Sequence, residues 1–220
     1  MNYKRITLLC GHYGSGKTNI AVNMALDLSR DHEKVVIADL DIVNPYFRTV
    51  DSEEDLREAG VKLVVSSYAN SNVDIPALPQ EMYSLVDDRS LTCVVDVGGD
   101  DRGAYALGRI SGAIREENDY DMFLVINRYR PLTPDAESTL EIMHEIEAAA
   151  SLPFTGIINN SNLAAETEPE TVLASVDYAE EVAALAGLPL VMTSVEKSVA
   201  ERLEGRIDGL FPMTLQKRPV

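Results

Sequence analysis

Eight residues near the amino terminus constrain the fold more than any other segment. Gly11–Thr18 reads GHYGSGKT and fits the pattern G-x-x-x-x-G-K-[ST] at every fixed position. The apolar run Ile6–Cys10 precedes it, and a segment with apolar residues on one helical face follows it. This order of buried strand, glycine-rich turn and helix predicts an α/β fold in which the turn wraps a phosphate group.

The residue types in this turn suit the binding of a polyphosphate. Glycines adopt backbone conformations that other residues avoid, so consecutive N–H groups can turn inward around an anion. The start of the following helix adds partial positive charge. We expect Lys17 to pair with the terminal phosphates and the Thr18 hydroxyl to bind Mg²⁺. A nucleoside polyphosphate is therefore the expected ligand, and a glycine-rich turn without a ligand is the alternative.

Apolar runs alternate with helical patterns along the chain. Strands are predicted at Ile6–Cys10, Val35–Ala38, Val61–Val65, Thr92–Val97, Met122–Ile126, Phe154–Ile158 and Leu190–Thr193. Helices are predicted at Gly16–Arg30, Asp51–Ala59, Ala104–Glu117, Pro134–Ala150, Glu170–Ala186 and Ser198–Leu203. Continuous Val, Ile and Leu runs indicate strands covered on both faces, which predicts a three-layer α/β/α sandwich with a mainly parallel central sheet. We expect one P-loop nucleotide-binding domain over residues 1–220, since neither a linker-like stretch nor a repeat divides the chain.

Acidic residues follow two of the predicted strands, at the sheet edge where ligands of such folds bind. Asp39 and Asp41 come after the second strand and point the same way if the strand alternation continues. They predict a magnesium shell or a group that orients water near the γ-phosphate, unless they only cap a turn. Asp96 ends an apolar run as a Walker B carboxylate does, which predicts contact with Mg²⁺ directly or through water. Gly99 allows the backbone to approach the γ-phosphate closely.

Amide side chains end a later predicted strand, at Asn159 and Asn160. An asparagine amide carries both donors and an acceptor and so matches the edge of a purine. The N-K-x-D pattern with which GTPases read guanine is absent, which favours ATP. The alternative is an asparagine-rich turn.

Arginines follow several strand ends, at Arg48, Arg102, Arg128 and Arg130. In so acidic a chain they suggest an anionic second ligand, although each taken alone is also typical of ordinary surface. We expect catalytic roles for Lys17, Asp39, Asp41 and Arg48, and metal binding by Thr18, Asp39 and Asp96. The residues expected to bind the nucleotide are Gly11, His12, Tyr13, Gly14, Ser15, Gly16, Lys17, Thr18, Asn19, Gly99, Asn159 and Asn160.

Charge and cysteine content exclude several classes of function. The formal net charge of −17, from 19 basic and 36 acidic residues, disfavours binding to nucleic acid or to an anionic membrane surface. Cys10 and Cys93 lie in apolar runs and form no C-x-x-C pair, so a zinc or iron–sulfur site is not expected. The chain shows neither a signal-peptide-like apolar region nor a run long enough to cross a bilayer, which predicts a cytoplasmic protein.

The order of these motifs resembles the MinD/ParA/Mrp class of P-loop NTPases, part of the SIMIBI group. That class also contains cobyrinic acid amidating enzymes, dethiobiotin synthetase and the nitrogenase iron protein. Asp41 follows Lys17 by 24 positions, as in the MinD/ParA branch. The resemblance implies ATP and Mg²⁺ as cofactors, a water-positioning role for Asp41, the Walker B role for Asp96 and an adenine contact for Asn159.

One position departs from the MinD/ParA branch. His12 stands where that branch has a signature lysine that reaches across a dimer to the partner's phosphates. Neutral histidine does not replace that charge, so the cross-subunit contact is not carried over, and a homodimer is an open possibility. Loops of the ligase branch also lack this lysine.

Three functions follow from this interpretation. The first is an ATPase that acts as a nucleotide-dependent switch or an assembly or maturation factor for a protein partner. The second is an ATP-dependent ligase or amidating enzyme that activates the carboxylate of a small anionic substrate. The third is an ATP sensor that does not hydrolyse. Release of ADP without a second substrate, turnover only with a carboxylate, or binding without turnover distinguishes them.

Overall fold

The structure is a computed structural model that describes residues 3–40, 52–65, 80–99 and 101–216. Asp41 and Arg48, two of the residues expected to act in catalysis, lie outside the described residues. For Arg102 the description covers the backbone but not the side chain.

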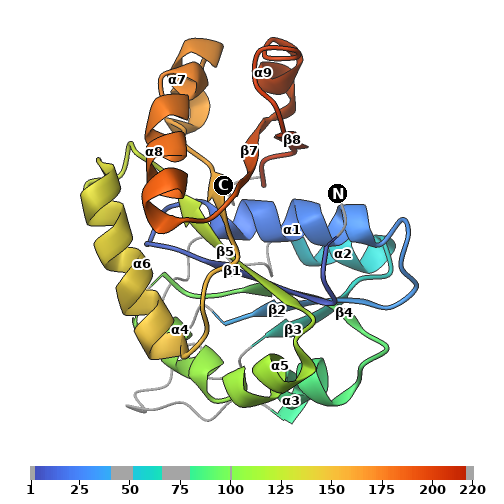
Figure 1. The fold of residues 1–220 in the computed structure, drawn as a ribbon. Helices are drawn as coiled ribbons and strands as arrows, with labels where there is room; N and C mark the ends of the chain where they lie inside the picture. Colours follow the sequence, from blue (N-terminus) through green and yellow to red (C-terminus); the bar gives the residue numbers. More distant parts are fainter. Residues whose placement is uncertain (1–2, 41–51, 66–79, 100, 217–220) are drawn as a thin grey trace.

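The described residues form a central sheet of eight strands in the order β3-β2-β4-β1-β5-β6-β7-β8. Every pair of neighbouring strands is parallel, which confirms the predicted sheet (Figure 1). The strands are β1 (Ile6–Cys10), β2 (Val35–Asp39), β3 (Lys62–Val65), β4 (Thr92–Asp96), β5 (Tyr120–Ile126), β6 (Gly156–Asn159), β7 (Leu190–Glu196) and β8 (Leu210–Met213). Because β1 lies between β4 and β5, the loop after β1 opens at the middle of the sheet's carboxyl edge.

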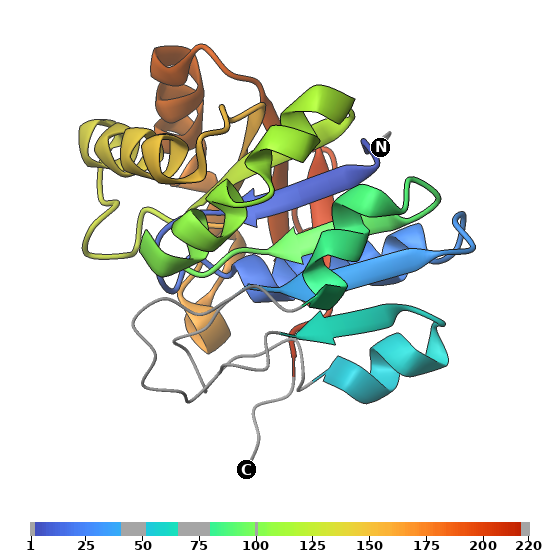
Figure 2. The same ribbon diagram turned by 90° about the horizontal axis from the view of Figure 1, so that it is seen from below.

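Helices cover both faces of the sheet and complete three layers (Figures 1 and 2). They are α1 (Lys17–Leu28), α2 (Glu53–Glu58), α3 (Gln80–Asp87), α4 (Asp101–Gly108), α5 (Ser111–Glu117), α6 (Ala136–Ala150), α7 (Pro169–Leu173), α8 (Val176–Ala186) and α9 (Lys197–Glu201). Helices α1 and α2 lie on one face, and α3, α4 and α5 lie on the other (Figure 1). Among the described residues, no helix is long and apolar enough to cross a membrane.

Among the described residues, two large apolar cores, one on each face, hold the layers together, and a third, smaller cluster joins α7, β7 and α9. On one face Ile20 and Met24 of α1 pack with Leu9 of β1. On the other, residues of α3 to α6 and α8 pack against Leu8 and the alternate positions of the same strands. All five residues of β1 are buried. This two-sided burial explains the continuous apolar runs by which the strands were predicted.

Apart from shifts of one to three residues at their ends, the observed elements differ from the predicted ones in the following ways. The predicted helix 104–117 is two helices, α4 and α5, and in the turn between them the Ser111 hydroxyl donates to the carbonyl oxygen of Gly108 at 2.8 Å. The predicted helix 170–186 is also divided, at Ser175, whose hydroxyl donates to the carbonyl oxygen of Val172 at 2.6 Å. Helix α3 and strand β8 were not predicted. Pro212 fits β8 because β8 is an edge strand, where a missing N–H is tolerated.

Candidate nucleotide-binding site

The loop after β1 has the backbone of a phosphate cradle. Gly11, Gly14 and Gly16 have φ values of 145°, 75° and 92°, which side chains rarely tolerate. A Cβ atom on Gly11 would lie 2.4 Å from the carbonyl oxygen of Val125, and one on Gly16 would lie 2.1 Å from Nδ2 of Asn160. All three glycines suit these backbone conformations, and Gly11 and Gly16 are also required by the close approach of β5 and of the segment after β6.

Lys17 begins helix α1 and is buried, with 6% of its surface exposed. Its ammonium group donates to the carbonyl oxygens of Gly11 at 2.9 Å and His12 at 3.1 Å, so it is held inside the loop. The buried Ser15 hydroxyl also lies in this loop, and its Oγ has no hydrogen-bond partner within the described part of the chain. Together they provide a cation and a hydroxyl at the site predicted for phosphate.

Thr18 and Asp96 meet where a magnesium ion was predicted. The Thr18 hydroxyl donates to Oδ2 of Asp96 at 2.6 Å, which joins the first turn of α1 to the end of β4. Asp39 pairs in register with Asp96 across β2 and β4, and both residues are buried. Oxygen ligands of this kind fit Mg²⁺, which proteins commonly hold through one or two carboxylates and the phosphates of a substrate.

Two glycines after β4 permit close backbone contacts, and one of them, Gly99, lies against the phosphate loop. A Cβ atom on Gly99 would lie 2.6 Å from the backbone nitrogen of Tyr13. A Cβ atom on Gly103 would lie 2.6 Å from the backbone nitrogen of Gly98. Gly99 therefore lies against the backbone of the phosphate loop, whereas its approach to the γ-phosphate stays a prediction.

The two asparagines predicted to read the base are buried and bonded within the protein. Asn159 is fully buried, and its amide donates to the Ser175 hydroxyl at 3.0 Å while its Oδ1 accepts from the Ser161 N–H at 3.1 Å. Asn160 donates to the carbonyl oxygen of Ser15 at 2.6 Å and accepts from the Ser194 hydroxyl at 2.9 Å. Asn160 thus ties the end of β6 to the phosphate loop, whereas the adenine contact of Asn159 stays a prediction.

The remaining loop residues have mixed surroundings. Tyr13 is 56% exposed, and Nδ1 of His12 lies 3.1 Å from the carbonyl oxygen of Tyr13. Oδ1 of Asn19 accepts from the backbone N–H of Gln216 at 2.9 Å. The side chain of Asn19 is therefore bonded to the carboxyl-terminal segment, a contact that sequence spacing does not indicate.

Arg130 is a neighbour of the loop that was expected only as one member of a group of arginines. Its Nε donates to the carbonyl oxygen of Gly14 at 2.8 Å. Arg128, from the same segment, points elsewhere and donates to the carbonyl oxygen of Ala174. The sequence placed both arginines after a strand, but only the fold distinguishes them.

Cys10 at the end of β1 lies close to the site but is not suited to act as a nucleophile. Burial raises the pKa of the Cys10 thiol to about 12, although the charge of Lys17 acts in the opposite direction. The thiol therefore stays protonated at neutral pH and packs as a small apolar group.

Solved structures with this fold include proteins of the signal recognition pathway. The receptor FtsY from Mycoplasma mycoides matches with a TM-score of 0.53 and 21% identity, over 86% of this chain and 59% of that one. The signal recognition particle 54 kDa protein from Aeropyrum pernix, in complex with GDP, matches with a TM-score of 0.53 and 19% identity, over 87% and 41%. FtsY from Elizabethkingia anophelis matches with a TM-score of 0.52 and 16% identity, over 88% and 59%.

The chain thus spans well under two thirds of the length of these neighbours, and at this identity the likeness concerns the fold. No curated protein matches the chain. A family model, the CobQ/CobB/MinD/ParA nucleotide-binding domain, matches residues 6–186, which include the phosphate loop, Asp96 and both asparagines. A glycine cradle, a buried lysine and a threonine–aspartate pair at the carboxyl edge of a parallel sheet agree with that match. The chain belongs to the CobQ/CobB/MinD/ParA family of nucleotide-binding domains.

Proposed function

We propose that this nucleotide-binding domain is a Mg-ATP-dependent ATPase that works as a switch or as an assembly or maturation factor. The observation that carries the proposal is the 2.6 Å hydrogen bond between the Thr18 hydroxyl and Asp96. It brings the first turn after the phosphate loop to the Walker B strand. A magnesium ion held by this pair would neutralise charge on the terminal phosphates. ATP is proposed over GTP because no N-K-x-D pattern is present in the sequence.

The residues of the chain divide the work in the following way. Lys17 exchanges the carbonyl oxygens of Gly11 and His12 for phosphate oxygens, so the buried ammonium group keeps charge-assisted hydrogen bonds throughout. Asp39 supports the hydration shell of the metal from the neighbouring strand. Asp41 orients the attacking water, an assignment that rests on its place after the second strand in the sequence and on the family resemblance.

The proposal of a switch is based on the segments that follow β2 and β4 in the chain. Strand β2 ends at Asp39 and runs into residues 41–51, while β4 ends at Asp96 and runs through Gly98 and Gly99 toward α4. Asp39 and Asp96, the last residues of these two strands, pair in register at the proposed metal position. We infer that a change from ATP to ADP at that position acts through the ends of both strands and hence alters the affinity for a protein partner.

Nucleotide binding is tested by thermal unfolding and calorimetry with Mg-ATP and Mg-GTP. A hundredfold excess of ligand over Kd stabilises the native state by about 2.7 kcal/mol, which raises Tm by about 5–10 °C. Lys17→Ala is expected to abolish the shift and to leave the fold intact by circular dichroism. The absence of a shift with either nucleotide would overturn the proposal, and a larger shift with GTP would overturn the choice of ATP.

The role in turnover is tested by measuring ADP release without any second substrate. Release by the wild type, together with loss of turnover but not of binding in Asp41→Ala, is expected. ADP release only after addition of a small carboxylate would identify a ligase instead. Tight binding without release under either condition would identify a sensor.

A further inference from the structure

Arg130 lies directly on the phosphate loop. Its Nε donates to the carbonyl oxygen of Gly14 at 2.8 Å. A Cβ atom on Gly14 would lie 3.5 Å from Nε and 3.7 Å from Cζ, so the guanidinium occupies the side of Gly14 that a side chain would fill. Because Gly14 has no side chain, the guanidinium can lie directly against its backbone.

The segment that carries Arg130 is fixed by its own hydrogen bonds. Asn127 is fully buried, and its Oδ1 accepts from the N–H groups of Tyr129 at 3.0 Å and Asn162 at 3.4 Å. The carbonyl oxygen of Asn127 accepts from the Thr133 hydroxyl at 2.8 Å and from the N–H of Arg130 at 3.1 Å. The position of Arg130 is therefore set by a braced turn between β5 and α6.

Arg128 shows what a purely structural arginine in this turn does. Its guanidinium lies 5.9 Å from the ring centre of Tyr129 and 5.8 Å from that of Tyr178, and it donates to the carbonyl oxygen of Ala174. These contacts attach the turn to the segment between α7 and α8. Arg130 instead faces the nucleotide-binding loop, although both arginines come from the same four residues, Asn127–Arg130.

The order of the strands indicates which half of a nucleotide Arg130 meets. The groups suited to the metal and the terminal phosphates, Thr18 with Asp96 and the neighbouring Asp39, lie toward β4 and β2. Arg130 comes from the end of β5, on the opposite side of β1. A nucleotide whose terminal phosphates lie on the β4 side extends its nucleoside toward β5 and β6.

We propose that Arg130 is a nucleoside-contacting residue whose guanidinium stacks on the base of the bound purine nucleotide. This inference rests on the proposed function. A guanidinium is planar and weakly hydrated, and it stacks face to face on aromatic rings. Its Nε–H can still donate a hydrogen bond in the plane of the guanidinium while the face is stacked. The bond to Gly14 orients the plane before the nucleotide arrives. Stacking reads the π face rather than the edge, so it serves adenine and guanine alike.

The test measures the affinity of Arg130→Ala and Arg130→Lys for ADP, GDP and inorganic tripolyphosphate by calorimetry. Arg130→Ala is expected to weaken ADP and GDP binding by about tenfold and to leave tripolyphosphate binding unchanged. Arg130→Lys keeps the charge but loses the plane, so it is expected to remain close to the alanine variant. Arg109→Ala is the matched control, because it removes one charge from an exposed position at the end of α4.

Each result decides the proposal. Equal loss of ADP and tripolyphosphate affinity, or recovery of wild-type affinity in Arg130→Lys, would show that Arg130 binds the phosphates or supports the phosphate loop through Gly14, and would overturn the proposal. Unchanged ADP affinity in Arg130→Ala would overturn it as well. If the wild-type protein binds no nucleotide, the proposed function itself fails. The wild-type measurement therefore tests the proposed function, and the variants test only the role of Arg130.

Discussion

Around the phosphate loop, the close approach of backbone segments decides which positions must be glycine. Gly99 is the sharpest case, because its missing Cβ atom leaves room for the Tyr13 backbone. We expect Gly99→Ala to push the β4 connection away from the loop, lower ADP affinity at least tenfold and reduce Tm by several degrees. Gly112→Ala in α5, where a Cβ atom meets nothing within 4 Å, is the control and should be neutral or slightly stabilising. Wild-type ADP affinity in Gly99→Ala would show that the loop adjusts freely.

Asp96 supports a second prediction at the residue scale. Asp96→Asn removes the charge but keeps an oxygen that can accept from the Thr18 hydroxyl, so the fold is expected to survive. The magnesium dependence of ATP binding should then fall about tenfold, while binding of metal-free ADP changes little. Calorimetry with Mg²⁺ and with a chelator measures both. A magnesium dependence equal to that of the wild type would remove Asp96 from the metal site.

At the scale of elements, the carboxyl-terminal segment is attached to α1 by side chains of the helix. Asn23 donates to the carbonyl oxygen of Thr214 at 2.9 Å and accepts from its N–H at 2.8 Å. Asn19 accepts from the N–H of Gln216 one turn earlier, next to the phosphate loop. The two asparagines thus hold the backbone that follows β8 alongside helix α1.

The contribution of this attachment can be measured with Asn23. Asn23→Ala loses both hydrogen bonds to Thr214 and a third, from Nδ2 to the carbonyl oxygen of Asn19 at 2.8 Å, which together costs about 1–2 kcal/mol and lowers Tm by about 3–6 °C. Asn23→Asp keeps the acceptor for the Thr214 N–H and should lie between the alanine variant and the wild type. Nucleotide affinity is expected to stay at the wild-type value in both, since Asn23 makes these contacts outside the loop. An unchanged Tm in Asn23→Ala would mean that the segment is held by other contacts.

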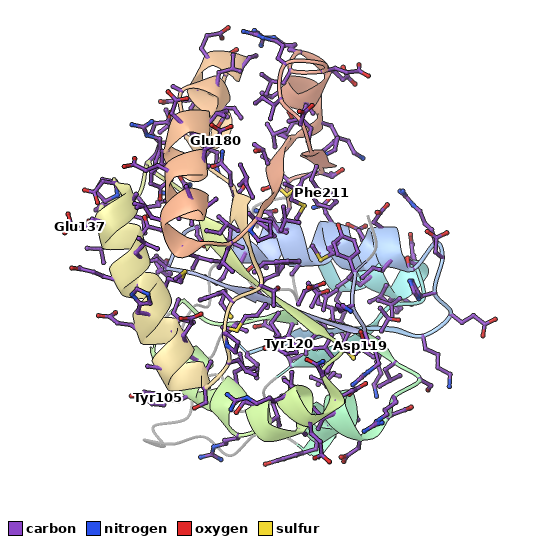
Figure 3. All side chains as sticks on the ribbon, viewed as in Figure 1. Tyr105, Asp119, Tyr120, Glu137, Glu180 and Phe211 are labelled. Carbon is purple, nitrogen blue, oxygen red and sulfur yellow. The ribbon has the colours of Figure 1, made fainter. Side chains whose placement is uncertain are left out.

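Across the whole molecule, an ion pair clamps the end of the sheet opposite the nucleotide site. Arg5 binds Glu117 through two hydrogen bonds of 2.5 Å each, and it also donates to the carbonyl oxygens of Leu85 and Leu91. Asp119 and Tyr120 mark this end of β5 in Figure 3. Through these bonds Arg5, the residue before β1, is joined to the end of α5, to the last turn of α3 and to the residue before β4.

The clamp predicts how stability depends on pH. Hydrogen bonds from Arg5 lower the pKa of Glu117 below its usual value. A lowered carboxylate pKa stabilises the fold above the unfolded value, and that stability is lost as pH falls through the folded value. Glu117→Gln should therefore lower Tm by about 5 °C at pH 7, with the difference shrinking below about pH 4.5. Thermal unfolding across this range measures it, and a difference that is the same at every pH would contradict it.

Several strands could be predicted from the sequence because they depend only on the pattern of apolar residues over a short stretch of chain. The strand predictions for β1, β2 and β4 agree with the structure to within one residue, since buried parallel strands are continuous apolar runs. Helix α3 was missed, although Met82, Leu85 and Val86 have helical spacing and could have indicated it. Strand β8 was missed because four residues containing Pro212 resemble a turn. Asp41 and Arg48 lie outside the described residues, so their roles stay predictions.

The sequence by itself determined the phosphate loop, the α/β/α class and the acidic strand ends, because each follows from the type of residue and its immediate spacing. Only the tertiary structure decided which polar groups meet. It placed Arg130, and not Arg128, on Gly14, and it turned the Asn19 side chain toward Gln216. These partners are far apart along the chain. A hydrogen bond depends on distance and direction in space, and spacing along a sequence specifies neither until the strands have taken their order in the sheet.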